Sequence, residues 1–240
     1  MRQLLVGLFI LATSLLYAQS YIDSGIRHFA AGEYDEALID FKDAEEIESM
    51  ITESSKAKLY YYRGIIWLNK AESAVGFAEE DPLQMSFQDL TQVLSMDPDW
   101  EPQIKKAYEK LHSLILDEAE DYTKLARKEE ALNGQLSLLD TRIGYLQMAE
   151  KLEVSTRPIL LLGQTNKYAG DLLFDNAGND LTELKKSRKY YEKALQYYEI
   201  ARYDDPFSKE IIEELLLISR RLTDAERIEE YEKLLELAGG

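Results

Sequence analysis

The stretch from Tyr21 to Ile47 constrains the fold of this chain more than any other part of its sequence. It holds an early glycine, Gly25, and later an alanine, Ala37, one helical turn before Phe41. Small residues let two helix axes approach to about 8–10 Å, and an aromatic ring fills the space beside them. Gly32 fits the residue just past a helix end, where only glycine adopts a left-handed backbone without strain. The pattern predicts two helices that pack closely.

This arrangement resembles a tetratricopeptide (TPR) repeat, which pairs a small first-helix residue with Ala-x3-Phe on the second helix, in a period of about 34 residues. A similar spacing returns where Gly64 precedes Ser86 and Leu90. It returns again where Ala194 and Tyr198 take the Ala and Phe positions. The resemblance implies an all-α fold, a right-handed α-solenoid of antiparallel helix pairs in a TPR-like superhelix. It covers most of residues 19–240 as a single domain of about four to five helical hairpins.

Two features of the later repeats have alternative assignments. The turn of the third unit lies either near Lys128, before a segment typical of a second-helix start, or at Asn133-Gly134, a common turn dipeptide. The small first-helix residue of the fourth unit is either Gly163 or Gly170.

Residues 1–18 have the pattern of a secretory signal peptide. Arg2 supplies a positive end, an apolar run follows, and the small residue Ala18 closes the segment. We expect cleavage after Ala18 and a periplasmic or secreted bacterial protein, with an uncleaved N-terminal anchor as the alternative. The chain has no cysteine, which excludes a lipoprotein. No later segment is apolar enough to span a bilayer, so we expect no integral membrane insertion after signal removal.

The formal net charge of −17 argues against nucleic acid as a partner, because phosphates would be repelled. The two histidines, His28 and His112, have no neighbouring ligands in a zinc pattern. Phosphate-binding and nucleophile motifs are absent from the sequence, and thiol catalysis is impossible without cysteine. We therefore expect a protein that is not an enzyme and uses no metal or cofactor.

The resemblance also implies a partner-binding groove, because the first helices of successive TPR units line the concave face. Transferring the family's groove positions gives Tyr61, Ile65 and Leu68 in the second unit, Lys105, Glu109 and His112 in the third, and Arg157, Gln164 and Lys167 in the fourth. Apolar residues beside aligned basic ones favour a peptide with apolar anchors and some acidic character. We expect a non-catalytic scaffold for a protein or peptide partner. A glycan or cell-wall-fragment binding module with exposed tyrosines is the alternative.

Overall fold

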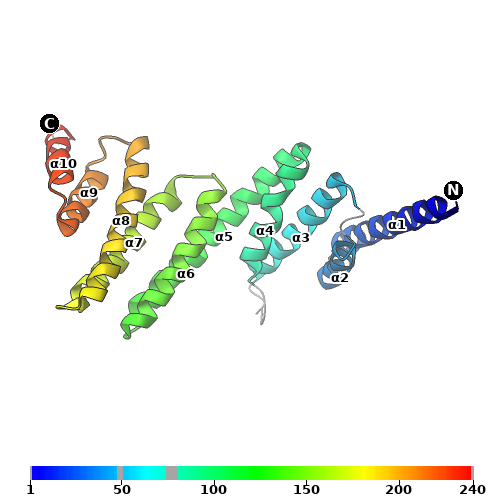
Figure 1. The fold of residues 1–240 in the computed structure, drawn as a ribbon, viewed down its shortest axis with the longest axis horizontal. Coiled ribbons are helices and arrows are strands. Elements are labelled where there is room, and N and C mark those ends of the chain that lie inside the picture. Colours follow the sequence, from blue (N-terminus) through cyan, green and yellow to red (C-terminus); the bar gives the residue numbers. More distant parts are fainter. Residues whose placement is uncertain (1, 48–50, 74–80, 239–240) are drawn as a thin grey trace. The chain divides into compact units, whose positions relative to one another are not determined.

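The computed structural model is all-α over the residues that it describes, which are 2–47, 51–73 and 81–238, with side chains described from Tyr17 onward. Helices that follow each other along the chain pack in pairs, so the expected all-α, solenoid-like fold class is confirmed (Figure 1). The chain divides into two compact units, Met1–Leu114 and Ile115–Gly240, whose boundary falls inside one long helix.

The helices of unit 1 are α1 (Arg2–Ala31), α2 (Tyr34–Glu45), α3 (Glu53–Ser73), α4 (Pro82–Met96), the short 3-10 helix η2 (Pro98–Trp100) and the first half of α5 (Glu101–Lys128). Unit 2 contains the second half of α5, α6 (Leu132–Lys151), α7 (Arg157–Ala177), α8 (Leu181–Asp204), α9 (Lys209–Leu222) and α10 (Ala225–Ala238). In the described part of the chain, none of these helices is long and apolar enough to cross a membrane.

The small residues of unit 1 lie where two helices approach most closely. A Cβ atom added at Gly25 would lie 2.6 Å from the ring of Phe41, so α1 and α2 could not pack as they do. Likewise, a Cβ atom added at Gly64 of α3 would lie 2.8 Å from the side chain of Leu90 in α4. The close contacts predicted from the spacing of these residues are therefore confirmed.

The α7–α8 pair contains this contact twice. A Cβ atom at Gly163 would lie 3.1 Å from Tyr198, and one at Gly170 would lie 3.0 Å from Tyr191. Gly163 faces the aromatic position predicted from the repeat, so it is the equivalent of Gly25. Gly170 repeats the contact two helical turns away, which explains why both glycines fitted the pattern.

The turn of the third unit lies near Lys128, where α5 ends, and α6 begins at Leu132. The alternative turn at Asn133-Gly134 is wrong, because both residues belong to the first turn of α6. Glu129 stabilises the connection: its side chain accepts a 3.0 Å hydrogen bond from the amide of Ala131. Gln135 donates a 2.6 Å bond to the carbonyl oxygen of Glu129. The first bond satisfies the amide of the residue before α6, and the second satisfies a carbonyl oxygen just past the end of α5.

Aspartates begin two of the second helices. The side chain of Asp81 accepts hydrogen bonds from the amides of Leu83 and Gln84 at the start of α4. Asp180 does the same at the start of α8, with a 2.7 Å bond from Thr182. These backbone bonds lower the pKa of Asp180, since they favour its charged form.

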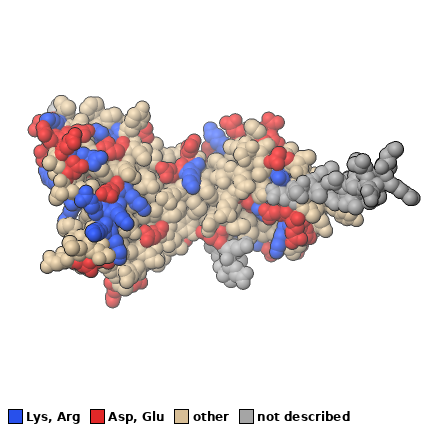
Figure 2. All heavy atoms as spheres, in the orientation of Figure 1, with Lys and Arg blue, Asp and Glu red and all other residues tan. Residues whose placement is uncertain are grey.

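The cores of unit 2 form between successive helices. One cluster joins α8, α9 and α10 around Ile212, Leu215 and Tyr231, and smaller clusters join α5, α6 and α7. Figure 2 shows acidic side chains spread over the visible surface of each unit, whereas Lys and Arg side chains gather over α8. Since the chain is strongly acidic, that gathering of positive charge is a local exception.

Candidate partner-binding surfaces

Tyr61 lies in a row of half-buried aromatic side chains in unit 1, here called the aromatic row: Phe29, Tyr61, Tyr62 and Trp100. The ring centroids of Tyr61 and Trp100 are 4.5 Å apart, and those of Tyr61 and Tyr62 are 5.3 Å apart. The ring of Tyr62 in turn meets Phe29 of α1 edge-on at 5.1 Å. Elements distant in sequence thus contribute to one partly exposed aromatic surface.

The local structure explains how the row assembles. Tyr61 and Tyr62 follow each other on α3, so their side chains diverge by about 100° and reach different neighbours. Trp100 is held in place by the short helix η2, where the Asp97 side chain accepts a 3.2 Å hydrogen bond from the amide of Asp99. Ser54 at the start of α3 donates a 3.2 Å bond to the same carboxylate. This tie brings the tryptophan beside α3.

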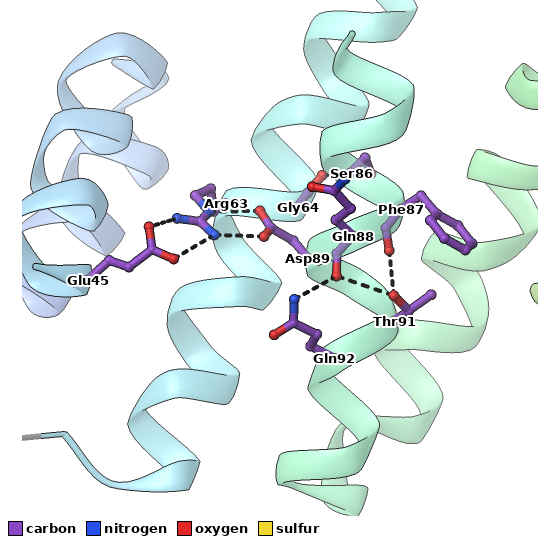
Figure 3. Close-up of polar contacts among 9 residues, drawn as sticks. All are labelled: Glu45, Arg63, Gly64, Ser86, Phe87, Gln88, Asp89, Thr91 and Gln92. Atoms are coloured by element: carbon purple, nitrogen blue, oxygen red, sulfur yellow. Dashed lines mark hydrogen bonds and ion pairs between the residues drawn. The ribbon is translucent and has the colours of Figure 1, made fainter. Parts of the chain in front are cut away.

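A partly buried ion-pair network centred on Arg63, the residue that follows Tyr62 on α3, connects this helix to its neighbours (Figure 3). The guanidinium of Arg63 donates two 2.8 Å hydrogen bonds to Asp89 of α4 and a 2.7 Å bond to Glu45 of α2. Burial opposes its charge, but the bonds to Asp89 and Glu45 raise the pKa of Arg63 above its ordinary value. Burial also raises the pKa of Asp89, although Arg63 acts against that rise. One side chain of α3 therefore joins three helices.

The other predicted residues of α3 are less available than Tyr61. Ile65 is partly buried, and Leu68 is 2% exposed, so Leu68 is part of the core and not of an open surface. The reason is that α3 packs against α1, α2 and α4, and so it buries more than one face. Consecutive residues Ile66, Trp67 and Leu68 are all buried as a result.

The predicted residues of α5 divide in the same way. Lys105 and Glu109 are exposed, whereas His112 is 6% exposed and lies in the interior with Leu111. Sequence spacing placed the three on one face of the helix, but α5 is covered more fully at His112 than two turns earlier. Only Lys105 and Glu109 remain accessible to a partner.

The structure corrects the expected charge of the groove positions on α7. Arg157 and Gln164 are exposed, but Lys167 forms ion pairs with Asp171 at 3.3 Å and with Glu214 of α9 at 3.5 Å. Gln164 lines a pocket of about 210 Å³ whose walls include three carboxylates, those of Asp204, Asp205 and Glu210. The surroundings of Lys167 are therefore acidic, and this lysine offers little free positive charge to an acidic peptide.

The partners of Tyr61 in the aromatic row were not predicted from the sequence. Tyr62 is adjacent to Tyr61, and Trp100 closes the second repeat two residues after Pro98, so both were visible as aromatic residues. Their contact was not visible, because it depends on how η2 folds back onto α3.

Comparison with models of known protein families finds no match to this chain, and comparison with characterised proteins finds no significant match. Within the described residues, no group of three or more His, Asp and Glu side chains is placed to hold a metal ion.

Proposed function

We propose that this protein is a non-catalytic scaffold of the tetratricopeptide type that binds a protein or peptide partner in the bacterial cell envelope. The aromatic row of unit 1 is the observation that carries the proposal. Tyrosine and tryptophan are the residues most enriched at the energetic centres of protein interfaces, because they offer large apolar surface and few rotatable bonds. The signal-peptide pattern of residues 1–18 supports the envelope as the compartment.

The arrangement of the row favours a protein partner over a small ligand. Its rings are fixed by each other and by η2, so little side-chain freedom is lost on binding. Like any tyrosine, Tyr61 is protonated at neutral pH and can donate a hydrogen bond; burial, and then the neighbouring Tyr62, raise its pKa further. A surface that combines apolar area with hydroxyl groups suits the apolar anchors and backbone carbonyls of a peptide.

A glycan-binding module is the second candidate, since exposed tyrosine and tryptophan rings also stack on sugars. The close approach of Tyr61 and Trp100 favours this possibility, as two neighbouring rings form a small platform. The same contact also argues against glycan binding, because each ring covers part of the surface of the other ring. The experiment below separates the two candidates.

The test introduces a photo-crosslinking aromatic amino acid at Tyr61 in the native host. We expect one defined protein adduct, identified by mass spectrometry, and no such adduct from the control position Tyr203, which is 87% exposed on α8. With the purified partner, the double change Tyr61→Ala and Trp100→Ala should weaken binding by roughly 30-fold, the effect of losing one interface hot spot of about 2 kcal/mol. Helical circular dichroism should be retained.

Two results would contradict the proposal. The first is an equal pattern of adducts from Tyr61 and Tyr203, which would mean that the aromatic row is not an interface. The second is selective binding of the purified chain to a glycan array that is lost in the Tyr61→Ala and Trp100→Ala variant, which would establish the glycan module instead.

A further inference from the structure

A pocket of about 310 Å³ lies in unit 2 among α6, α7 and α8. Its apolar lining comes from Leu136, Leu173 and the ring of Tyr190. The pocket is at the lower end of the size range for ligand sites, roughly 300–1,000 Å³, so it suits one or two side chains better than a large ligand. None of these residues belongs to the aromatic row.

Three lysines of α8 surround this opening, and we call the whole site the lysine pocket. Lys186, Lys189 and Lys193 line it, are exposed, and lie on one face of the helix at spacings of three and four residues. Lys186 pairs with Glu183 at 2.8 Å. Lys189 and Lys193 form no ion pair with any residue that the structure describes. Figure 2 shows a gathering of Lys and Arg side chains over α8, the helix that carries both lysines.

The one carboxylate that lines the pocket in the described residues, that of Asp140, is already engaged. It accepts a 2.7 Å hydrogen bond from the hydroxyl of Tyr190. Burial, and then the bond and charge of Asp140, raise the pKa of Tyr190, so the phenol keeps its proton to a higher pH than an ordinary tyrosine and continues to donate this bond. Lys189 and Lys193 are left without a described counter-ion, so their positive charge is available to a partner although the chain has a net charge of −17.

The spacing of the three lysines indicates the length of ligand that the lysine pocket can accept. Lys193 lies seven positions after Lys186, which is about 10 Å along a helix axis. That length exceeds a single carboxylate or phosphate group. It matches about three residues of an extended peptide, at roughly 3.3 Å per residue. An extended acidic segment can therefore meet more than one lysine while one of its apolar side chains enters the opening beside them.

We propose that the lysine pocket is a docking site for an acidic peptide segment of a partner protein. Carboxylates of the segment pair with Lys189 and Lys193, and an apolar side chain enters between Leu136 and Leu173. All residues of the lysine pocket belong to unit 2. This proposal can therefore be tested independently of the proposed role of the aromatic row in unit 1.

The test uses short random peptides displayed on phage and selected against the full chain. We expect the enriched peptides to carry Asp or Glu on either side of an apolar residue. A fluorescent copy of the most enriched peptide should bind more weakly as added salt screens the charges. Its affinity should fall roughly tenfold to hundredfold in the double variant Lys189→Glu and Lys193→Glu.

The matched control reverses two other basic residues of α8, Lys185→Glu and Arg188→Glu. These side chains line a different pocket with residues of α9, so the change in net charge is the same while the lysine pocket is intact. The control should retain the affinity of the unchanged chain. All four positions are exposed, and lysine and glutamate have similar helix propensities, so both variants should fold, as checked by circular dichroism.

Three outcomes would overturn the proposal. Enriched peptides without acidic residues would show that the lysines do not select the ligand. An equal loss of affinity in both double variants would mean that net charge alone attracts the peptide. Selective binding of anionic phospholipid vesicles to the lysine pocket, with no peptide enrichment, would assign it to a membrane surface.

Discussion

The hydroxyl of Ser187 donates a 2.8 Å hydrogen bond to the backbone carbonyl oxygen of Gly170, and so ties α8 to α7. Ser86 makes the same bond, 3.0 Å long, to the carbonyl oxygen of Gly64, and ties α4 to α3. In both pairs the serine stands four residues before the side chain that covers the same glycine. One contact thus recurs in two helix pairs from different units, as expected of a chain built from a repeated hairpin.

The recurring glycine gives the first prediction. Gly64→Ala should destabilise the protein by about 1–3 kcal/mol, because the new Cβ would lie 2.8 Å from buried Leu90 and 3.2 Å from Asp89, which Arg63 holds in place. Gly144→Ala is the matched control in α6, where no atom lies within 4 Å of the added group. It should stabilise the protein by about 0.5–1 kcal/mol through helix propensity. Urea unfolding measures both, and changes of the same sign would contradict the assigned packing.

The second prediction concerns the facing small residue of the α7–α8 pair. Ala194 is fully buried, and Ala194→Leu should lower the free energy of unfolding by about 1–3 kcal/mol through overpacking. Ala225→Leu, at an exposed position in α10, should change stability by less than about 0.5 kcal/mol. Thermal melts of the two variants compare the sites. An unchanged melting temperature for Ala194→Leu would show that α7 and α8 do not meet at this residue.

The third prediction concerns the ion-pair network of Figure 3. Arg63→Met should cost about 3–5 kcal/mol, because it leaves the side chain of Asp89, which is 3% exposed, without a counter-charge. Adding Asp89→Leu should recover much of that loss, since the pair is then replaced by apolar side chains. As a control, Arg220→Met removes an ion pair whose side chains are 57% and 51% exposed, and should cost less than about 1 kcal/mol. No recovery in the double variant would show that Asp89 is not the source of the loss.

The fourth prediction is a loss of stability at alkaline pH. Burial is the main cause that raises the pKa of Tyr190, Tyr191, Tyr198 and Tyr231 above the ordinary value of 10.0. Above that pH the unfolded chain loses these protons first and binds fewer protons than the folded chain, so the free energy of unfolding falls as pH rises. Urea midpoints below and above pH 10 measure the fall. Tyr190→Phe should make it shallower, and a midpoint that rises with pH would contradict the assignment.

The fifth prediction concerns export. We expect the protein from its native host to begin at Gln19, after removal of residues 1–18. Gln19 accepts a 2.9 Å hydrogen bond from Ser55 at the start of α3, so this cleavage keeps the contact. Intact-mass measurement of the envelope fraction decides the matter. A chain that still carries Met1 there would support the uncleaved anchor.

The sequence by itself determined the helical class and the places where helices meet. The resemblance to the tetratricopeptide repeat paired Gly25 with Phe41, and likewise Gly64 with Leu90, and the structure brings each pair into contact. The physical reason is local: a close crossing needs a residue without a side chain on one helix and a filling side chain at a fixed position on the next. This requirement is visible in the sequences of the α1–α2, α3–α4 and α7–α8 pairs.

Only the tertiary structure decided which surfaces are open and what charge they carry. Leu68 shares the spacing of a groove residue but is buried, because α3 has neighbours on several sides. Lys167 is neutralised by Glu214 of another helix, whereas Lys189 and Lys193 form no described ion pair and stand beside an apolar pocket. The burial and the local charge of a residue depend on neighbours that are distant along the chain but adjacent in space. The periodicity of a single helix therefore cannot predict either property.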